Sequence, residues 1–207
     1  MTRRLVRALA ICMAAGAVSA MSSQSSLAGQ ISESTQFFAV HGDTLSELDR
    51  SLSKGGPVLP GSGQRHPGAT SVQFDGHVSY KRVNGGCAVD KTDIKLRLKT
   101  MLPKWYRPKR VDPHTTLVWR TLAADISRHE KRHSEIAISY LKRLESALKN
   151  LRPERTCRQM EAMANTVMSR YLREHERAQQ EFDLIEGREV DLRLRRALYR
   201  SLYSAQQ

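Results

Sequence analysis

Two long helical patterns separated by a proline constrain the fold of this chain more than any other feature of its sequence. From Pro113 to Leu151, apolar side chains recur every three or four residues, as they do in a helix that buries one face. Arg152-Pro153 ends this pattern, because a proline cannot continue a helix. A second pattern of the same kind runs from Glu154 to Glu186. The short turn between them predicts a long antiparallel helical hairpin.

The residues before the hairpin alternate between apolar and polar side chains over three stretches, as strands do. These stretches are residues 31–40, 70–83 and 87–102. Asn84-Gly85-Gly86 separates the last two and suits a hairpin turn. We therefore expect an α+β fold in which a small antiparallel sheet packs on the long helical hairpin.

Two shorter helices are expected outside this framework. Thr44 and Glu47 resemble a capping box that opens a helix over residues 45–52. A loop rich in glycine and proline follows at residues 55–68. Beyond Gly187, residues 188–203 predict a further helix that packs on the hairpin or on a partner.

The first long helix carries the pattern His-Glu-x-x-His at His129, Glu130 and His133. Residues four apart on a helix share a face, so both imidazoles can bind one metal ion with Glu130 beside it. The expected ion is Zn²⁺, with the ring nitrogens about 2.0–2.1 Å away. Glu130 would then act as general base toward a water activated by the metal, and later pass the proton to a leaving amine.

A second interpretation of the two histidines stays open. His129 and His133 fall in the apolar stripe of the helix, which turns them toward the interior. They could therefore be core or boundary histidines that only form hydrogen bonds. The residues between Glu130 and His133 are Lys131 and Arg132, whereas most zinc-peptidase helices have uncharged residues there.

A third metal ligand is expected from the second long helix. At 1.5 Å per residue, the His-Glu-x-x-His turn and His175 both lie roughly 30 Å from the hairpin bend. His175 also falls in the apolar stripe of its helix, so it ranks first. The alternatives are Glu174 or Glu176 in second place and Glu186 in third. Candidates for stabilising an oxyanion are Tyr140 and Tyr171.

The first 28 residues are typical of a secretory signal peptide, with basic residues 2–7 followed by small apolar residues. Cleavage is expected after Ala20 or Ala28, and an uncleaved membrane anchor is the alternative. The prediction is a bacterial protein, periplasmic or secreted, with no transmembrane segment after cleavage. Residues 29–207 have a length that suits a single domain.

Removal of the leader removes Cys12 and leaves Cys87 and Cys157. In an oxidising compartment two such cysteines predict one disulfide, which contributes about 2–4 kcal/mol. This disulfide would join the two halves of the chain, and two buried free thiols are the alternative. No Cys-x-x-Cys pair exists, which excludes a zinc ribbon and a thioredoxin-type site.

The formal net charge is +13, of which Arg3, Arg4 and Arg7 of the leader account for three. Such a charge favours anionic partners, including envelope polymers, lipid headgroups and nucleic acid. Basic runs at residues 104–110 and 193–196 could contact phosphates, although such runs are more commonly a solvated face of the protein. No nucleic-acid recognition module is present, and export argues against a nucleic-acid partner.

Several short motifs occur in a characteristic order: Gly42-Asp43-Thr44, Glu47-Leu48, Val78-Ser79-Tyr80, Leu102-Pro103-Lys104-Trp105, Trp119, His129-Glu130, His133, Cys157 and Phe182-Asp183. In these the chain resembles a bacterial domain-of-unknown-function family described as predicted secreted zinc-dependent proteases. The resemblance implies a compact α+β zincin-like domain with His129 and His133 as ligands and Glu130 as general base. Typical members have Tyr-Asp and then His-Gly where this chain has Phe182-Asp183 and Glu186-Gly187, so the third ligand stays open.

The sequence therefore predicts an exported zinc metalloprotease, a hydrolase acting on a peptide or protein substrate that an edge strand could hold in extended form. The alternative is a non-catalytic basic envelope protein, in which a metal is absent or only joins the helices. A basic helical nucleic-acid binder is a third class.

Overall fold

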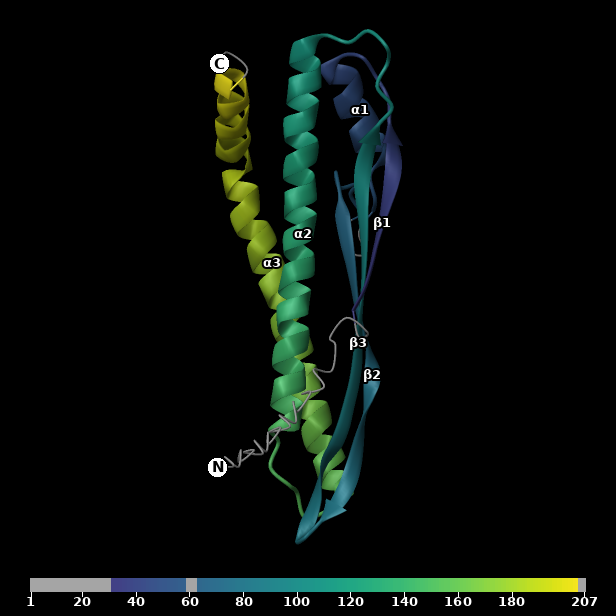
Figure 1. Ribbon diagram of the computed structural model, residues 1–207, viewed down its shortest axis with the longest axis vertical. Helices are drawn as coiled ribbons and strands as arrows, with labels where there is room; N and C mark the ends of the chain where they lie inside the picture. The colour runs from purple at the N-terminus through teal and green to yellow at the C-terminus, as the bar shows by residue number, and fades with distance from the viewer. Residues whose placement is uncertain (1–30, 59–62, 205–207) are drawn as a thin grey trace, which may run out of the picture.

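The computed structural model describes residues 31–58 and 63–204, and the expected signal peptide lies outside them. The elements in chain order are β1 (Ile31–Val40), α1 (Leu45–Gly55), β2 (Ala69–Val83), β3 (Gly86–Trp105), α2 (Pro113–Lys149) and α3 (Cys157–Ser204). Figure 1 shows an elongated molecule in which the sheet lies along one side of α2 and α3 lies along another. The α+β class expected from the sequence is confirmed.

The sheet has the strand order β1-β3-β2 and is mixed. β3 pairs antiparallel with β2 across the predicted turn and parallel with β1. The sequence predicted a wholly antiparallel sheet, and this expectation was wrong. In the β2–β3 hairpin, β2 pairs with one edge of β3, and β1 pairs with the other edge. The last residues of β1 and β3, Val40 and Trp105, pair with each other near α1. The two strands therefore run in the same direction.

α1 begins where the capping residues predicted it. Thr44 Oγ1 accepts a hydrogen bond from the backbone N–H of Glu47 at 3.3 Å. The Glu47 carboxylate accepts in turn from the N–H of Asp43 at 2.9 Å, one residue earlier than in the usual capping box. The helix buries Leu48 and Leu52 in a small core cluster with Val40, Trp119 and Ile126. This cluster attaches α1 to the N-terminal half of α2.

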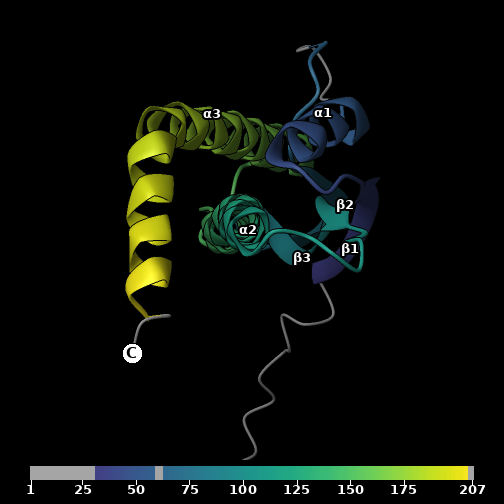
Figure 2. The ribbon, with the colours of Figure 1, turned by 90° about the horizontal axis from the view of Figure 1, so that it is seen from above.

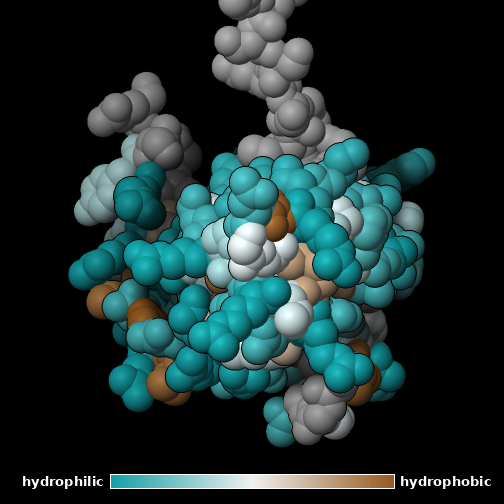
Figure 3. All heavy atoms as spheres, turned by 90° about the horizontal axis from the view of Figure 1, so that it is seen from below, coloured by the Kyte–Doolittle hydropathy of each residue, from teal (hydrophilic) through white to brown (hydrophobic). Residues whose placement is uncertain are grey.

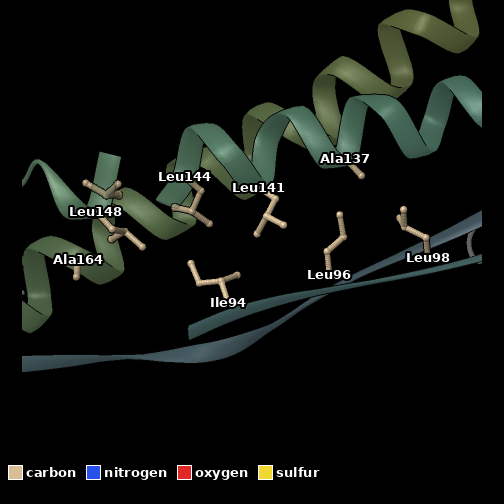
Figure 4. Packing of buried hydrophobic residues seen from close by; sticks show 9 residues of the cluster. Ile94, Leu96, Leu98, Ala137, Leu141, Leu144, Leu148 and Ala164 are labelled. Atoms are coloured by element: carbon tan, nitrogen blue, oxygen red, sulfur yellow. The ribbon is translucent and has the colours of Figure 1, made fainter. Parts of the chain in front are cut away.

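The larger core cluster lies between β3, α2 and the beginning of α3 (Figure 4). Alternate residues of β3 point at α2, which presents leucines and an alanine at helical spacing. The buried members are Ile94, Leu96, Leu98, Ala137, Leu141, Leu144, Leu148, Ala164 and Val167. Burying one such large side chain stabilises a fold by about 1.5–3 kcal/mol, so this cluster fixes α2 on the sheet.

The bend between the two long helices is tied to the β2–β3 turn. Cys87 and Cys157 form a disulfide, which confirms the predicted pairing. Beside it, the backbones of Cys87 and Glu154 exchange two hydrogen bonds of 2.8 and 2.9 Å. A Cβ atom at Gly86 would lie 2.1 Å from the carbonyl oxygen of Glu154, so this approach requires glycine. α3 consequently starts beyond the end of α2, near the tip of the β-hairpin (Figure 1).

α3 runs unbroken from Cys157 to Ser204, through Gly187. The sequence predicted two helices here, and this expectation was wrong. A glycine inside a helix costs only about 1 kcal/mol relative to alanine and does not by itself end it. Figure 2 shows the C-terminal part of α3 pointing in a different direction from the rest. Among the described residues, no helix is both long enough and apolar enough to cross a membrane.

Candidate metal centre

His129 and His133 lie one turn apart on the face of α2 that is directed at α3. Their Nε2 atoms are 3.0 Å apart, and their ring centroids are 4.7 Å apart. Their side chains are 27% and 13% exposed, as expected for histidines placed in the apolar stripe. The two nitrogens therefore converge on one point between the helices.

Asp183 of α3 supplies a third donor atom at this point. Its Oδ1 lies 3.2 Å from Nε2 of His129 and 3.0 Å from Nε2 of His133. Donors bound tetrahedrally to Zn²⁺ at 2.0–2.1 Å are about 3.3–3.4 Å apart, so the three atoms fit a zinc ion after a small outward movement. Two imidazoles and one carboxylate leave a fourth position open, as in catalytic zinc sites.

Phe182 packs against both candidate imidazoles. Its ring stacks on His129, with the centroids 4.8 Å apart and the planes inclined by 29°. It meets His133 edge-on at 5.0 Å. Because Phe182 precedes Asp183 in α3, one turn of that helix supplies both a ligand and the apolar contact that limits movement of the rings.

The other ring nitrogen of His133 forms a hydrogen bond with α3. Its Nδ1 lies 2.6 Å from Oε1 of Gln179, one turn before Asp183. An amide oxygen can only accept, so Nδ1 carries the proton and Nε2 of the neutral ring presents its lone pair. A metal-binding histidine commonly uses its other N–H in this way.

The side chains around His129 form a group of ion pairs. Its Nδ1 lies 3.8 Å from Oε2 of Glu186. Glu186 also pairs with Arg193 at 3.1 Å and with Arg128. Arg193 in turn binds both carboxylate oxygens of Asp125, at 2.7 and 3.0 Å. These pairs join α2 to α3 on the side of His129 away from Gln179.

The pKa values at the triad follow from these contacts. Burial alone would raise the pKa of Asp183, but its bonds to His129 and His133 hold that pKa far below its ordinary value. Burial also acts to lower the pKa of His133, but Asp183 and Gln179 raise it above its ordinary value. Asp183 is therefore an anion at neutral pH and attracts positive charge to this point.

Glu130 is turned toward the beginning of β2 and is 5% exposed. Its Oε2 accepts a hydrogen bond of 2.8 Å from the hydroxyl of Thr70. A Cβ atom at Gly68 would lie 2.9 Å from Oε1 of Glu130, so the chain can pass the carboxyl group only because residue 68 is glycine. Burial raises the pKa of Glu130, which makes the carboxylate a better proton acceptor.

A pocket of about 600 Å³ opens beside these groups. α2, α3 and the residues leading into β2 all contribute to its wall. Its polar lining includes His129, Glu130, His133 and Asp183, and its apolar lining includes Val72, Leu122, Ile126 and Val190. The donor atoms and the buried carboxyl group thus face one space of ligand size.

The structure places Asp183, and not His175, beside the two histidines. Nε2 of His175 lies 2.8 Å from the amide nitrogen of Gln179, and its ring packs edge-on against Phe74 and Tyr140. Burial lowers the pKa of His175, which keeps its imidazole neutral. His175 lines the pocket two helical turns before Asp183.

His175 was predicted in place of Asp183 because the bend between α2 and α3 was expected earlier in the chain than it lies. The contacts His133–Gln179 and His129–Asp183 are both symmetric about residue 156, whereas the sequence suggested a bend at Arg152-Pro153. Residues 150–156 continue to the β-hairpin tip before α3 begins. Moving the bend by about four residues moves the facing residue of α3 by about eight, or roughly 12 Å.

The other predicted residues have different surroundings. Glu174 pairs with Arg143 and Arg170 outside the pocket, whereas Glu176 lines the pocket. Glu186 reaches the site through His129 and the two arginines. The tyrosines proposed for oxyanion stabilisation, Tyr140 and Tyr171, pack beside Arg143 and are not among the pocket-lining residues.

Sequence reasoning missed Asp183, Gln179, Thr70 and Gly68. One signal for the first two was present: polar residues recur at helical spacing along one face of α3, at His175, Gln179, Asp183, Glu186 and Arg193. The contacts of Thr70 and Gly68 with Glu130 depend on how the sheet packs on α2, which no local pattern contains.

The fold and site define an α+β protein with three side chains that could hold a metal ion between two long helices. The chain belongs to a bacterial family: the family model described as "Bacterial protein of unknown function (DUF922)" matches residues 35–189. No curated protein and no solved structure matches it. The family description names no activity, so the chemistry of the site must be inferred from its residues.

Proposed function

We propose that this chain is a zinc-dependent hydrolase that cleaves peptide bonds. The observation that carries the proposal is the triangle of His129 Nε2, His133 Nε2 and Asp183 Oδ1, with edges of 3.0–3.2 Å, beside the buried carboxyl group of Glu130. Structural zinc sites use four protein ligands, whereas catalytic sites use three. Three donors bordering a pocket favour catalysis.

The residues would divide the chemistry between them. His129, His133 and Asp183 would hold the zinc ion, which when bound supplies Lewis-acid activation of water and of the substrate carbonyl. Glu130 would accept the proton of the attacking water and pass it to the leaving amine. The hydroxyl of Thr70 and the wall at Gly68 would keep the Glu130 carboxylate in position.

The surroundings of the pocket suit an extended peptide. β2 is an edge strand, and its residues Ala69, Thr70 and Val72 border the pocket. An extended peptide could therefore pair with β2 and pass the metal centre. The apolar lining at Leu122, Ile126 and Val190 would receive an apolar substrate side chain.

The proposed site of action is the periplasm or the exterior of a bacterial cell. The expected signal peptide supports export, and the Cys87–Cys157 disulfide suits an oxidising compartment. A peptidase outside the cytoplasm would act on envelope or secreted polypeptides.

Metal analysis by mass spectrometry is the first test. Exported wild-type protein should contain about one zinc per chain, and His129→Ala and Asp183→Ala should each lose most of it. His114→Ala is the matched control, because His114 lies on α2 and is exposed. Zinc-supplied wild-type protein without bound metal would contradict the proposal.

Glu130→Gln then separates catalysis from a structural role. A catalyst should keep its zinc and lose about 10²–10⁴-fold in peptide cleavage, because the general base is gone. A non-catalytic envelope protein, in which the metal only joins α2 to α3, should show no turnover in wild type. Cleavage is measured with a library of fluorescent peptides.

A further inference from the structure

The last part of α3, residues 184–204, is called the C-terminal arm below. Six of the twelve exposed large hydrophobic residues among the described residues lie in this arm: Leu184, Ile185, Leu192, Tyr199, Leu202 and Tyr203. By contrast, the end of the molecule at the β-hairpin tip presents mostly hydrophilic residues (Figure 3). The family match ends at residue 189, so most of the arm lies beyond it.

The exposed apolar residues of the arm share one face. Ile185, Leu192 and Tyr199 recur every seven residues, and at 100° per residue all six fall within about a third of the helix circumference. The opposite face contains Val190 and Arg193, which line the pocket. The arm therefore forms part of the pocket wall with one side and presents an apolar stripe on the other.

Arginines are interleaved with this stripe. Arg188, Arg195 and Arg196 are exposed, and the only acidic residues between positions 188 and 204 are Glu189 and Asp191. The carbon chain of an arginine can lie along apolar surface while its guanidinium group reaches a phosphate. Tyrosine, with an apolar ring and a polar hydroxyl, is enriched at the same kind of boundary.

We propose that the outer face of the C-terminal arm binds the surface of an anionic lipid membrane. The apolar stripe would enter the boundary between headgroups and acyl chains, and the arginines would bind lipid phosphates. A second copy of this chain fits the face less well, because pairing two such stripes side by side brings arginines of like charge together. The proposal is independent of hydrolase activity, although it would hold the pocket close to the membrane.

Vesicle sedimentation tests this proposal with exported full-length protein. Wild type should bind vesicles containing phosphatidylglycerol at least tenfold more tightly than vesicles of phosphatidylcholine alone, and added salt should weaken that binding. Leu192→Asp with Tyr199→Asp should reduce binding at least tenfold. Leu172→Asp is the matched control, because Leu172 is 42% exposed on α3 outside the arm.

A second double variant, Arg195→Glu with Arg196→Glu, tests the charge contribution separately and should also reduce binding at least tenfold. Circular dichroism and zinc content establish that each variant is folded. Three results would overturn the proposal: no binding at low salt, an equal loss in Leu172→Asp, or a concentration-dependent dimer that Leu192→Asp abolishes. The last result would identify a second copy as the occupant of this face.

Discussion

Gln179 contacts His133 twice: its Oε1 accepts from Nδ1–H at 2.6 Å, and its Nε2 donates to the backbone carbonyl at 3.1 Å. The amide cannot rotate without losing both bonds. Its nitrogen lies also 2.8 Å from Nε2 of His175, which as a neutral ring can accept. His175 thus helps to fix the amide orientation that leaves the lone pair of His133 Nε2 directed at the metal position.

Gln179→Leu should therefore weaken zinc binding. The expected loss is about 10–100-fold, the usual effect of removing a partner that orients a ligand. Gln179→Glu should recover part of the affinity, because a carboxylate still accepts from Nδ1–H. Competition with a chromophoric chelator measures the affinity. Gln180→Leu, the same change at the next residue, should have no effect, and an equal loss there would contradict the role of Gln179.

Gly68→Ala should impair catalysis without removing the metal. The new Cβ would lie 2.9 Å from Oε1 of Glu130 and 2.8 Å from Cγ2 of Ile126, so the carboxyl group must move. A fall in kcat of about tenfold or more is expected if Glu130 is the base, with zinc content unchanged. Gly187→Ala is the control, because a Cβ there meets no atom within 4 Å. Unchanged kcat in Gly68→Ala would contradict the position of Glu130.

Removal of the disulfide should destabilise the fold. Cys87 and Cys157 are separated by 70 residues, and losing a bridge of this kind typically costs about 2–5 kcal/mol. Urea unfolding of the Cys87→Ser, Cys157→Ser double variant should give a lower midpoint than wild type. Reductant should lower the wild-type midpoint and leave the variant unchanged; a midpoint insensitive to reductant in wild type would contradict the prediction.

Asp125 should contribute stability that depends on pH. Burial opposes the shift, but Arg193 and Arg128 hold the pKa of Asp125 below its ordinary value of 3.8. The ionised carboxyl therefore stabilises the fold above that pH, and the contribution is lost as pH falls through the folded-state pKa. The stability difference between wild type and Asp125→Asn should be constant above pH 5 and shrink below about pH 4. A stability difference that stays constant down to about pH 3 would contradict this role of the two arginines.

Local patterns predicted much of this molecule. The interior placement of His129 and His133 followed from helical spacing, and the pairing of Cys87 with Cys157 followed from their being the two cysteines left after export. The parallel pairing of β1 did not, because alternation reveals the faces of a strand and not its direction. Asp183 was missed because the residue of α3 that faces His129 depends on where the helical hairpin bends. Contacts between Glu154 and Cys87 determine that position.

The attachment of Cys157 and Glu154 to Cys87 also fixes where α3 begins, so the position of Asp183 depends on the number of residues between Cys157 and Asp183. From Cys157 to Asp183 the helix extends about 39 Å, and each inserted or deleted residue would turn Asp183 by about 100° around the helix axis. One such change would carry the carboxylate away from both histidines while leaving every ligand in the sequence. The gene should therefore accept many substitutions between these codons, but hardly any change in their number.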